Sequence, residues 1–196
     1  MTTETAAVVN GLRVQAIQEM VDAVKGQPQV AAATFSATTI WKRGFENEAT
    51  IKAFSLGGAR SETSRQQPFR VASDHPAELL GADKGPTSVE LLLTALGHCL
   101  SSGWAVYGAH MGIAFDSLPV EVEGEIDLQG MLGLPAPGMV APGFQRIRAT
   151  YYVRSSASRE QLEKLAKMSE DLSPTHHSLR AVDFASQLIV EPGNSN

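Results

Sequence analysis

The sequence has little of several residue types, and each shortage excludes a class of protein. A single cysteine, Cys99, stands among 196 residues, so neither an internal disulfide nor a cysteine-rich zinc site can form. The 16 Lys and Arg residues are outnumbered by 21 Asp and Glu, which argues against nucleic acid as a partner. No apolar run approaches the roughly 20 residues of a membrane span, and the start, Met1 to Arg13, lacks the features of a secretion signal. We therefore expect a soluble, cytoplasmic protein with no membrane partner.

Hydrophobic residues make up 43% of the chain and charged residues only 19%, which suffices for one sizeable core and little more. One domain is therefore expected. Near the start, Val14, Ile17, Val21 and Val24 recur at helical spacing, and Gly26 follows as a stop signal. This pattern predicts an N-terminal amphipathic helix.

A longer helix is predicted between Thr87 and Gly112. Thr87 and Glu90 have the Thr-x-x-Glu spacing of a capping box, in which the hydroxyl and the carboxylate satisfy backbone N–H groups at a helix start. Apolar side chains from Leu91 to Val106 are spread around much of this helix, so burial on more than one side is expected. We therefore expect it to be the central helix of the domain.

Strand patterns precede this helix. Alternation over Ala33–Trp41, followed by an extended pattern over Ala49–Leu56, predicts two strands joined by a turn at Lys42-Arg43-Gly44. A further short strand is expected at Phe69–Ala72, and irregular segments rich in Gly and Pro separate it from the helix.

After the central helix, two strands of opposite charge are predicted to pair. Val120–Leu128 alternates apolar residues with an acidic row, and the segment around Ile147 alternates them with arginines. Antiparallel pairing sets the two rows opposite each other, at roughly 0.2–1 kcal/mol per opposed pair, which favours a hairpin. Its connection, Gln129–Gly143, is longer than usual hairpin loops and is expected to form a flap. The rows are Glu121, Glu123, Glu125 and Asp127 on one strand, and Arg146, Arg148 and Arg154 on the other.

The end of the chain adds a helix and a strand. Ser158 is the expected cap of a last helix, Arg159–Ser169, and Phe184–Val190 is expected to form a closing strand. Strands, central helix, hairpin, helix and strand follow one another without regular βαβ alternation. This order predicts an α+β fold.

Cys99 is the most reactive side chain available, and two interpretations of it compete. A free cysteine is commonly a small buried hydrophobe, and Cys99 shares a helical stripe with Leu92, Leu96 and Val106. A position in the middle of a helix also gains nothing from the helix N-terminus. Activation of the thiol would therefore need a cation delivered from elsewhere.

Two other kinds of site have less support. The run from Gly97 to Ser101 imitates the nucleophile elbow of α/β-hydrolases with cysteine in place of serine, but a helical pattern precedes it where the elbow requires a strand. No pair of histidines has the HExxH spacing of a zinc site, and the neighbours His176 and His177 cannot easily face one ion from a helix. We expect neither a metal nor another cofactor.

The run from Gly81 to Leu100 resembles the loop and central helix of the OsmC/Ohr family, the osmotically inducible and organic-hydroperoxide-resistance proteins. The order of the later elements is similar to that of the family as well, so the resemblance covers about residues 30–191. It divides the chain into an N-terminal helical extension, residues 1–29, and an OsmC-like domain, residues 30–196.

The resemblance implies an α+β, OsmC-like fold in which antiparallel sheets wrap around a long central helix and two chains form an intertwined homodimer. It also implies reduction of small-molecule hydroperoxides, as part of oxidative stress defence, at sites made from both subunits. Cys99 matches the cysteine that attacks the peroxide and becomes a sulfenic acid. Arg43 is the candidate for the arginine that stabilises the thiolate.

Two positions depart from the peroxidase pattern. The family's resolving cysteine falls at Ser173, and the glutamate that orients the arginine falls at Val89. Glu90 lies on the opposite side of the helix from Cys99, so it is expected to serve as the cap partner of Thr87. One interpretation is a single-cysteine peroxidase that uses an external thiol reductant. The alternative is a non-catalytic protein that binds small molecules and has lost the peroxidase machinery.

Overall fold

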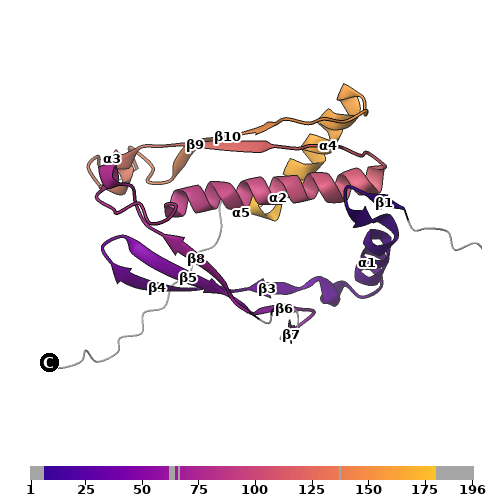
Figure 1. Cartoon of the computed structure of the whole chain (residues 1–196), viewed down its shortest axis with the longest axis horizontal. Coiled ribbons are helices and arrows are strands. Elements are labelled where there is room, and N and C mark those ends of the chain that lie inside the picture. Colours follow the sequence, from indigo (N-terminus) through magenta and orange to yellow (C-terminus); the bar gives the residue numbers. More distant parts are fainter. Residues whose placement is uncertain (1–6, 62–64, 66, 137, 180–196) are drawn as a thin grey trace, which may run out of the picture.

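The computed structural model describes residues 7–61, 65, 67–136 and 138–179, and Figure 1 shows their arrangement. Helix α2 lies in the middle of the molecule, with strands β9 and β10 along one side and strands β3 to β8 on the other. In chain order, the elements are β1 (Val8–Val9), β2 (Leu12–Arg13), α1 (Val14–Gly26), the 3-10 helix η1 (Pro28–Ala31), β3 (Ala33–Phe35), β4 (Thr38–Arg43), β5 (Glu46–Ile51), β6 (Phe54–Leu56), β7 (Ala59–Ser61), β8 (Phe69–Ser73), the 3-10 helix η2 (Ala77–Leu79), α2 (Ser88–Met111), β9 (Val120–Ile126), α3 (Leu128–Met131), β10 (Phe144–Tyr151), α4 (Arg159–Asp171) and α5 (Pro174–Ser178).

The predicted central helix is confirmed as α2. Its N-terminus has both halves of the capping box: Glu90 N–H donates to Thr87 Oγ1 at 3.3 Å, and Thr87 N–H donates to Glu90 Oε2 at 2.7 Å. Its C-terminus stops at Gly112, whose φ of 70° lies in the left-handed region that favours glycine. Both ends were therefore specified by local residues.

By length and composition alone, α2 is long and apolar enough to cross a membrane, although the sequence has no uninterrupted apolar run of that length. It contacts α4, β9, α5 and the N-terminal elements. Trp104 on this helix is buried with Leu165 of α4 and with Ile113, and Tyr151 of β10 packs against the same cluster. Burial of each such side chain contributes roughly 1.5–3 kcal/mol. The helix is thus the centre of the hydrophobic core.

The predicted hairpin is confirmed by the antiparallel pairing of β9 with β10. Strand β9 alternates half-buried and exposed residues along its whole length. Opposite the acidic row, Arg146 and Arg148 both form ion pairs with Glu125. Strand β9 of the hairpin packs on α2, and Figure 1 shows the hairpin lying along this helix.

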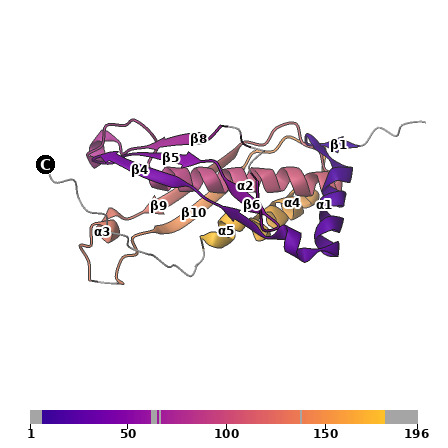
Figure 2. The ribbon, with the colours of Figure 1, turned by 90° about the horizontal axis from the view of Figure 1, so that it is seen from below.

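The strands before α2 form two small antiparallel sheets, in the orders β3-β6-β7 and β4-β5-β8. The predicted turn is confirmed at Gly44, whose φ of 50° favours glycine, although β5 begins earlier than expected, at Glu46. Figure 1 shows these sheets beneath α2, with α1 running from the C-terminal end of α2 to the level of β3, and Figure 2 shows the same strands in front of α2 when the molecule is seen from below. Several apolar side chains of these strands are exposed to solvent, among them Phe35, Ile40, Trp41 and Phe69.

The N-terminal helix is confirmed as α1, but the short hairpin of β1 and β2 before it was not predicted. Asn10, at the turn of that hairpin, donates from Nδ2 to the carbonyl of Ile113 at 3.0 Å and accepts the N–H of Phe115 at 3.1 Å. These two hydrogen bonds fasten the start of the described chain to the segment after α2. The predicted boundary between residues 1–29 and 30–196 stays a prediction.

The predicted last helix is confirmed as α4, which Ser158 caps together with Gln161. A short second helix, α5, follows it directly and is capped by Ser173. The predicted closing strand Phe184–Val190 lies outside the described residues.

Candidate active site around Cys99

The antiparallel packing of α4 against α2 positions the candidate site. Ser169, fully buried on α4, donates to the carbonyl of Leu100 at 3.0 Å. A Cβ atom on Gly103 would lie 2.7 Å from Ser169 Oγ, so only glycine allows the two helices to approach this closely. Cys99 lies one turn before Gly103 on α2, and Ser173 lies four residues after Ser169, just past the end of α4. These two residues meet.

The sulfur of Cys99 contacts hydroxyl groups of the segment that begins α5. Ser173 Oγ lies 3.1 Å from Cys99 Sγ and donates to it, and the hydroxyl and backbone amide of Thr175 are further polar groups that lower the pKa of Cys99. Burial raises the pKa of the Cys99 thiol, but these groups lower it, and the net pKa lies below its ordinary value. The site therefore favours the thiolate form.

Cys99 is partly exposed in a small cavity of about 190 Å³. Val106, Leu172 and Pro174 contribute apolar atoms to its lining, and Tyr107 of α2 is a further lining residue. Burial and the charge on Cys99 raise the pKa of Tyr107, so its hydroxyl is protonated at neutral pH. The thiol thus faces a mostly apolar space with a hydroxyl beside it.

The structure places Arg43 at the end of β4, where its Nε lies 3.2 Å from Glu46 Oε2 and its side chain is 74% exposed. Glu46 also pairs with Lys84 at 3.1 Å, and the hydrogen bonds from Lys84 and Arg43 lower the pKa of Glu46. Within one chain, therefore, Arg43 is held by a carboxylate on the neighbouring strand, whereas Cys99 is held by hydroxyl groups. The structure does not bring these two predicted site residues together.

The expected role of Glu90 as a cap partner is confirmed. Its carboxylate accepts hydrogen bonds from the hydroxyl and the backbone N–H of Thr87, which lower its pKa. Both hydrogen bonds come from Thr87, at the start of the helix. Glu90 is therefore committed to the cap, and Val89 offers no carboxylate in its place.

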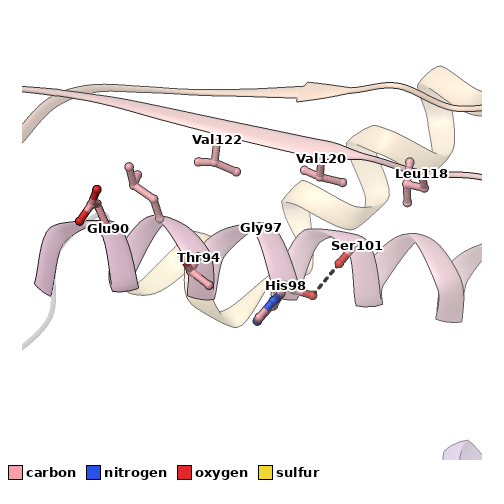
Figure 3. A pocket seen from close by; sticks show the side chains of 9 residues that line it. Glu90, Thr94, Gly97, His98, Ser101, Leu118, Val120 and Val122 are labelled. Carbon is pink, nitrogen blue, oxygen red and sulfur yellow. Dashed lines mark hydrogen bonds between the residues drawn. The ribbon is translucent and has the colours of Figure 1, made fainter. Parts of the chain in front are cut away.

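A larger cavity lies elsewhere, between α2 and β9, with a volume of about 520 Å³ (Figure 3). Gly97 leaves room on the helix side, and Val120 and Val122 form an apolar wall on the strand side. Cys99 is not among its lining residues. The thiol therefore belongs to the smaller cavity.

The side chains of His176 and His177 contact backbone carbonyls at the end of α4. His176 Nδ1 lies 3.0 Å from the carbonyl of Glu170, and His177 Nε2 lies 2.7 Å from the carbonyl of Asp171. Within the described part of the chain, no three His, Cys, Asp or Glu side chains gather as metal ligands would. The two histidine side chains therefore bind carbonyl groups at the C-terminus of α4.

Sequence reasoning missed Thr175, Ser169 and Gly103. A signal for the last two was present: a glycine stands four residues after Cys99, and a serine stands four residues before Ser173. Small residues at one-turn spacing on two helices indicate a close approach of their backbones. Thr175 carried no such signal, because its contact with the sulfur depends on the local path of the chain after Ser173.

These features define an α+β protein whose long central helix presents one thiol to a small apolar cavity. The chain belongs to the OsmC-like protein family, whose model matches residues 81–186. Among solved structures, an OsmC-like protein from Mycoplasma pneumoniae is similar, with 17% identity, a TM-score of 0.58, and coverage of 76% of this chain and 89% of that chain. An organic hydroperoxide resistance protein OsmC from Legionella pneumophila has 14% identity, a TM-score of 0.52, and coverage of 75% and 89%. At these identities the likeness shows a shared fold, and no curated protein sequence matches the chain.

Proposed function

We propose that this protein is a thiol-dependent peroxidase of oxidative stress defence, which reduces organic or hydrogen peroxides through Cys99. The observation that carries the proposal is the Cys99 sulfur itself, which is partly exposed, accepts a hydrogen bond from Ser173, and has a pKa below its ordinary value. The thiolate is the nucleophilic form of cysteine. The apolar lining beside it suits the organic part of a hydroperoxide.

The proposed chemistry needs one protein sulfur and an external thiol. The Cys99 thiolate attacks the terminal oxygen of the hydroperoxide, an S–O bond forms, and the O–O bond breaks. The leaving alkoxide takes a proton from water to become an alcohol, and the sulfur is oxidised to a sulfenic acid. A small thiol then converts the sulfenic acid into a mixed disulfide and water, and a second thiol restores Cys99 and leaves with the first as a disulfide. The reducing thiol pool of the cytoplasm is the proposed source.

The proposed working form is a homodimer. The side chains of Phe35, Trp41 and Phe69 are 72%, 67% and 58% exposed. Several large apolar side chains exposed on neighbouring strands are unusual for a monomer. A second copy of the chain would cover these side chains, as the intertwined family dimer implies. Arg43 is proposed to act across this interface, where it would supply a cation to the partner's thiolate while Glu46 orients it.

The proposal is tested by exposing the purified protein to an organic hydroperoxide, such as cumene hydroperoxide, with dimedone present to trap sulfenic acid. We expect the adduct on Cys99 by mass spectrometry, and hydroperoxide consumption in the presence of excess dithiothreitol. Cys99→Ser, which keeps the shape of the site, should abolish both. An unmodified Cys99 after treatment with an excess of peroxide would reject peroxidase activity.

A second candidate function is non-catalytic binding of a small molecule. It is favoured by Ser173, which cannot form a disulfide with Cys99, and by the cavity of about 520 Å³ between α2 and β9. The two functions differ in what Cys99→Ser does: ligand binding persists in that variant if the protein is a binder, and activity is lost if it is a peroxidase.

A further inference from the structure

We infer that Ser173 is an activating residue of the candidate site, which together with Thr175 holds the Cys99 sulfur as an anion through neutral hydrogen-bond donors. This inference deepens the proposed function and rests on it for its catalytic meaning. It assigns Ser173 a role of its own, in place of a lost thiol, and it makes activation possible within a single chain.

The Ser173 hydroxyl takes part in two hydrogen bonds, one as an acceptor and one as the donor to the Cys99 sulfur. Ser173 Oγ accepts the N–H of His176 at 3.1 Å and has only one hydrogen of its own. That hydrogen is directed to Cys99 Sγ at 3.1 Å. Because the oxygen is already polarised by the incoming N–H, its hydrogen becomes a better donor to a negative sulfur.

Thr175, two residues after Ser173, has a hydroxyl and a backbone amide that also lower the pKa of the same sulfur. A backbone N–H can only donate, so it offers no acceptor for the hydrogen of a protonated thiol. A thiolate, in contrast, accepts from all of these groups. The arrangement is complementary to the ionised sulfur rather than to the thiol.

The donor is held in place by the fold. Ser173 is only 3% exposed, its N–H donates to the carbonyl of Glu170 at 3.3 Å, and its carbonyl accepts the N–H of His177 at 3.0 Å. Because Ser173 is buried and its backbone is hydrogen-bonded at both its N–H and its carbonyl, its hydroxyl cannot rotate toward solvent. It therefore loses little freedom when the sulfur becomes charged, which is the condition for effective electrostatic stabilisation.

The titratable groups near the sulfur within one chain are neutral or hydrogen-bonded elsewhere. The hydroxyl groups therefore stabilise its negative charge. Tyr107, in the same cavity, is kept neutral by its raised pKa. His176 bonds through Nδ1 to the carbonyl of Glu170, and the Glu170 carboxylate accepts from Tyr151 at 3.1 Å. The groups that lower the pKa of the Cys99 thiol are the neutral donors of Ser173 and Thr175.

The experiment must separate this role from the structural one, since Ser173 also caps α5. Ser173→Ala removes both the donor and the cap. Ser173→Asp retains a good cap but replaces the donor by a negative charge. Ser173→Thr retains both, and Thr175→Val removes a donor without touching the cap. The readout is the pKa of Cys99 in the full-length protein, from thiolate absorbance and from the rate of iodoacetamide alkylation against pH.

We expect Ser173→Ala to raise the pKa of Cys99 by about one to two units, because a hydrogen bond to a charged group is lost. Ser173→Asp should raise it at least as much, Thr175→Val should raise it by a smaller amount, and Ser173→Thr should stay close to wild type. A pKa unchanged in a folded Ser173→Ala variant overturns the inference, and if Ser173→Ala does not fold, an unchanged pKa in Thr175→Val overturns it. The titration uses no peroxide, so a wild-type protein inert to hydroperoxide overturns the proposed function alone.

Discussion

Ser173 Oγ lies 3.1 Å from Cys99 Sγ, although 74 positions separate the two residues in the chain. The contact exists because α4 runs antiparallel to α2 and approaches it closely where Ser169 lies against Gly103. A hydroxyl thus stands at the position where the family resemblance implies a resolving cysteine. Four predictions test this geometry and the interactions that hold the fold around it.

Replacing Ser173 by cysteine should create an internal disulfide with Cys99. The two side chains already point at each other, and a small rotation brings two sulfurs to a bonding distance of about 2.0 Å. Intact mass after mild oxidation should show the loss of two hydrogen atoms. The double variant Cys99→Ser with Ser173→Cys is the matched control, since it has one thiol. Two free thiols after oxidation of Ser173→Cys would show that the side chains do not meet.

Gly103→Ala should destabilise the protein by about 1–3 kcal/mol, because its Cβ would lie 2.7 Å from Ser169 Oγ and push the helices apart. Gly97→Ala, on the same helix, is the control: its Cβ would lie 3.4 Å from Val122 Cγ2, close to ordinary contact. That variant should equal or exceed wild-type stability, since alanine favours helices by up to about 1 kcal/mol over glycine. Urea denaturation measures both, and equal stabilities would contradict the close approach.

Asn10→Ala should cost about 1–3 kcal/mol, because it leaves the Ile113 carbonyl and the Phe115 N–H without their partner. Asn47→Ala is a suitable comparison, since Asn47 donates one exposed hydrogen bond to the carbonyl of Phe45. Its effect should stay within about 0.5 kcal/mol. If thermal denaturation gave the two variants the same stability, the N-terminal hairpin would not be anchored as described.

Asp74 should make the protein sensitive to acid. Its buried carboxylate accepts backbone N–H groups of His75, Ala82 and Lys84. The hydrogen bond from His75, followed by those from Lys84 and Ala82, holds the pKa of Asp74 below its ordinary value. A lowered pKa in the folded state stabilises the fold above the unfolded pKa of about 3.9, and that stabilisation is lost as the pH falls through the folded value.

The measurement is urea denaturation of wild type and Asp74→Asn at neutral pH and at pH values of about 4 and below. Wild type should be the more stable of the two at neutral pH, and the difference should shrink in acid as Asp74 becomes protonated. A difference that stays constant across this range would mean that the charge on Asp74 contributes nothing.

Much of the fold could be predicted from the sequence, because its signals are local. The Thr87 and Ser158 capping boxes and the stop at Gly112 each depend on a few neighbouring residues. The hairpin of β9 and β10 followed from two charged rows with a period of two. The N-terminal hairpin escaped prediction because its anchor, Asn10, bonds to residues more than 100 positions away.

The candidate site was predictable in part. Cys99 was singled out as the only thiol, and Ser173 was noted through the family resemblance. The partners of Arg43 were not predictable, because Glu46 reaches it through a strand pairing and Lys84 through the loop before α2. The proposed action of Arg43 on a partner's thiolate stays a prediction.

The sequence by itself determined the ends of the central helix, the start of α4 and the β9–β10 hairpin, and that any thiol chemistry must use one sulfur. Caps, turns and periodicity involve residues close in the chain, so no tertiary information is needed to locate them. Only the tertiary structure decided which groups surround that sulfur. Close packing of α2 against α4 is possible where two small residues coincide, and this contact between distant segments, rather than any local pattern, sets a serine hydroxyl beside Cys99.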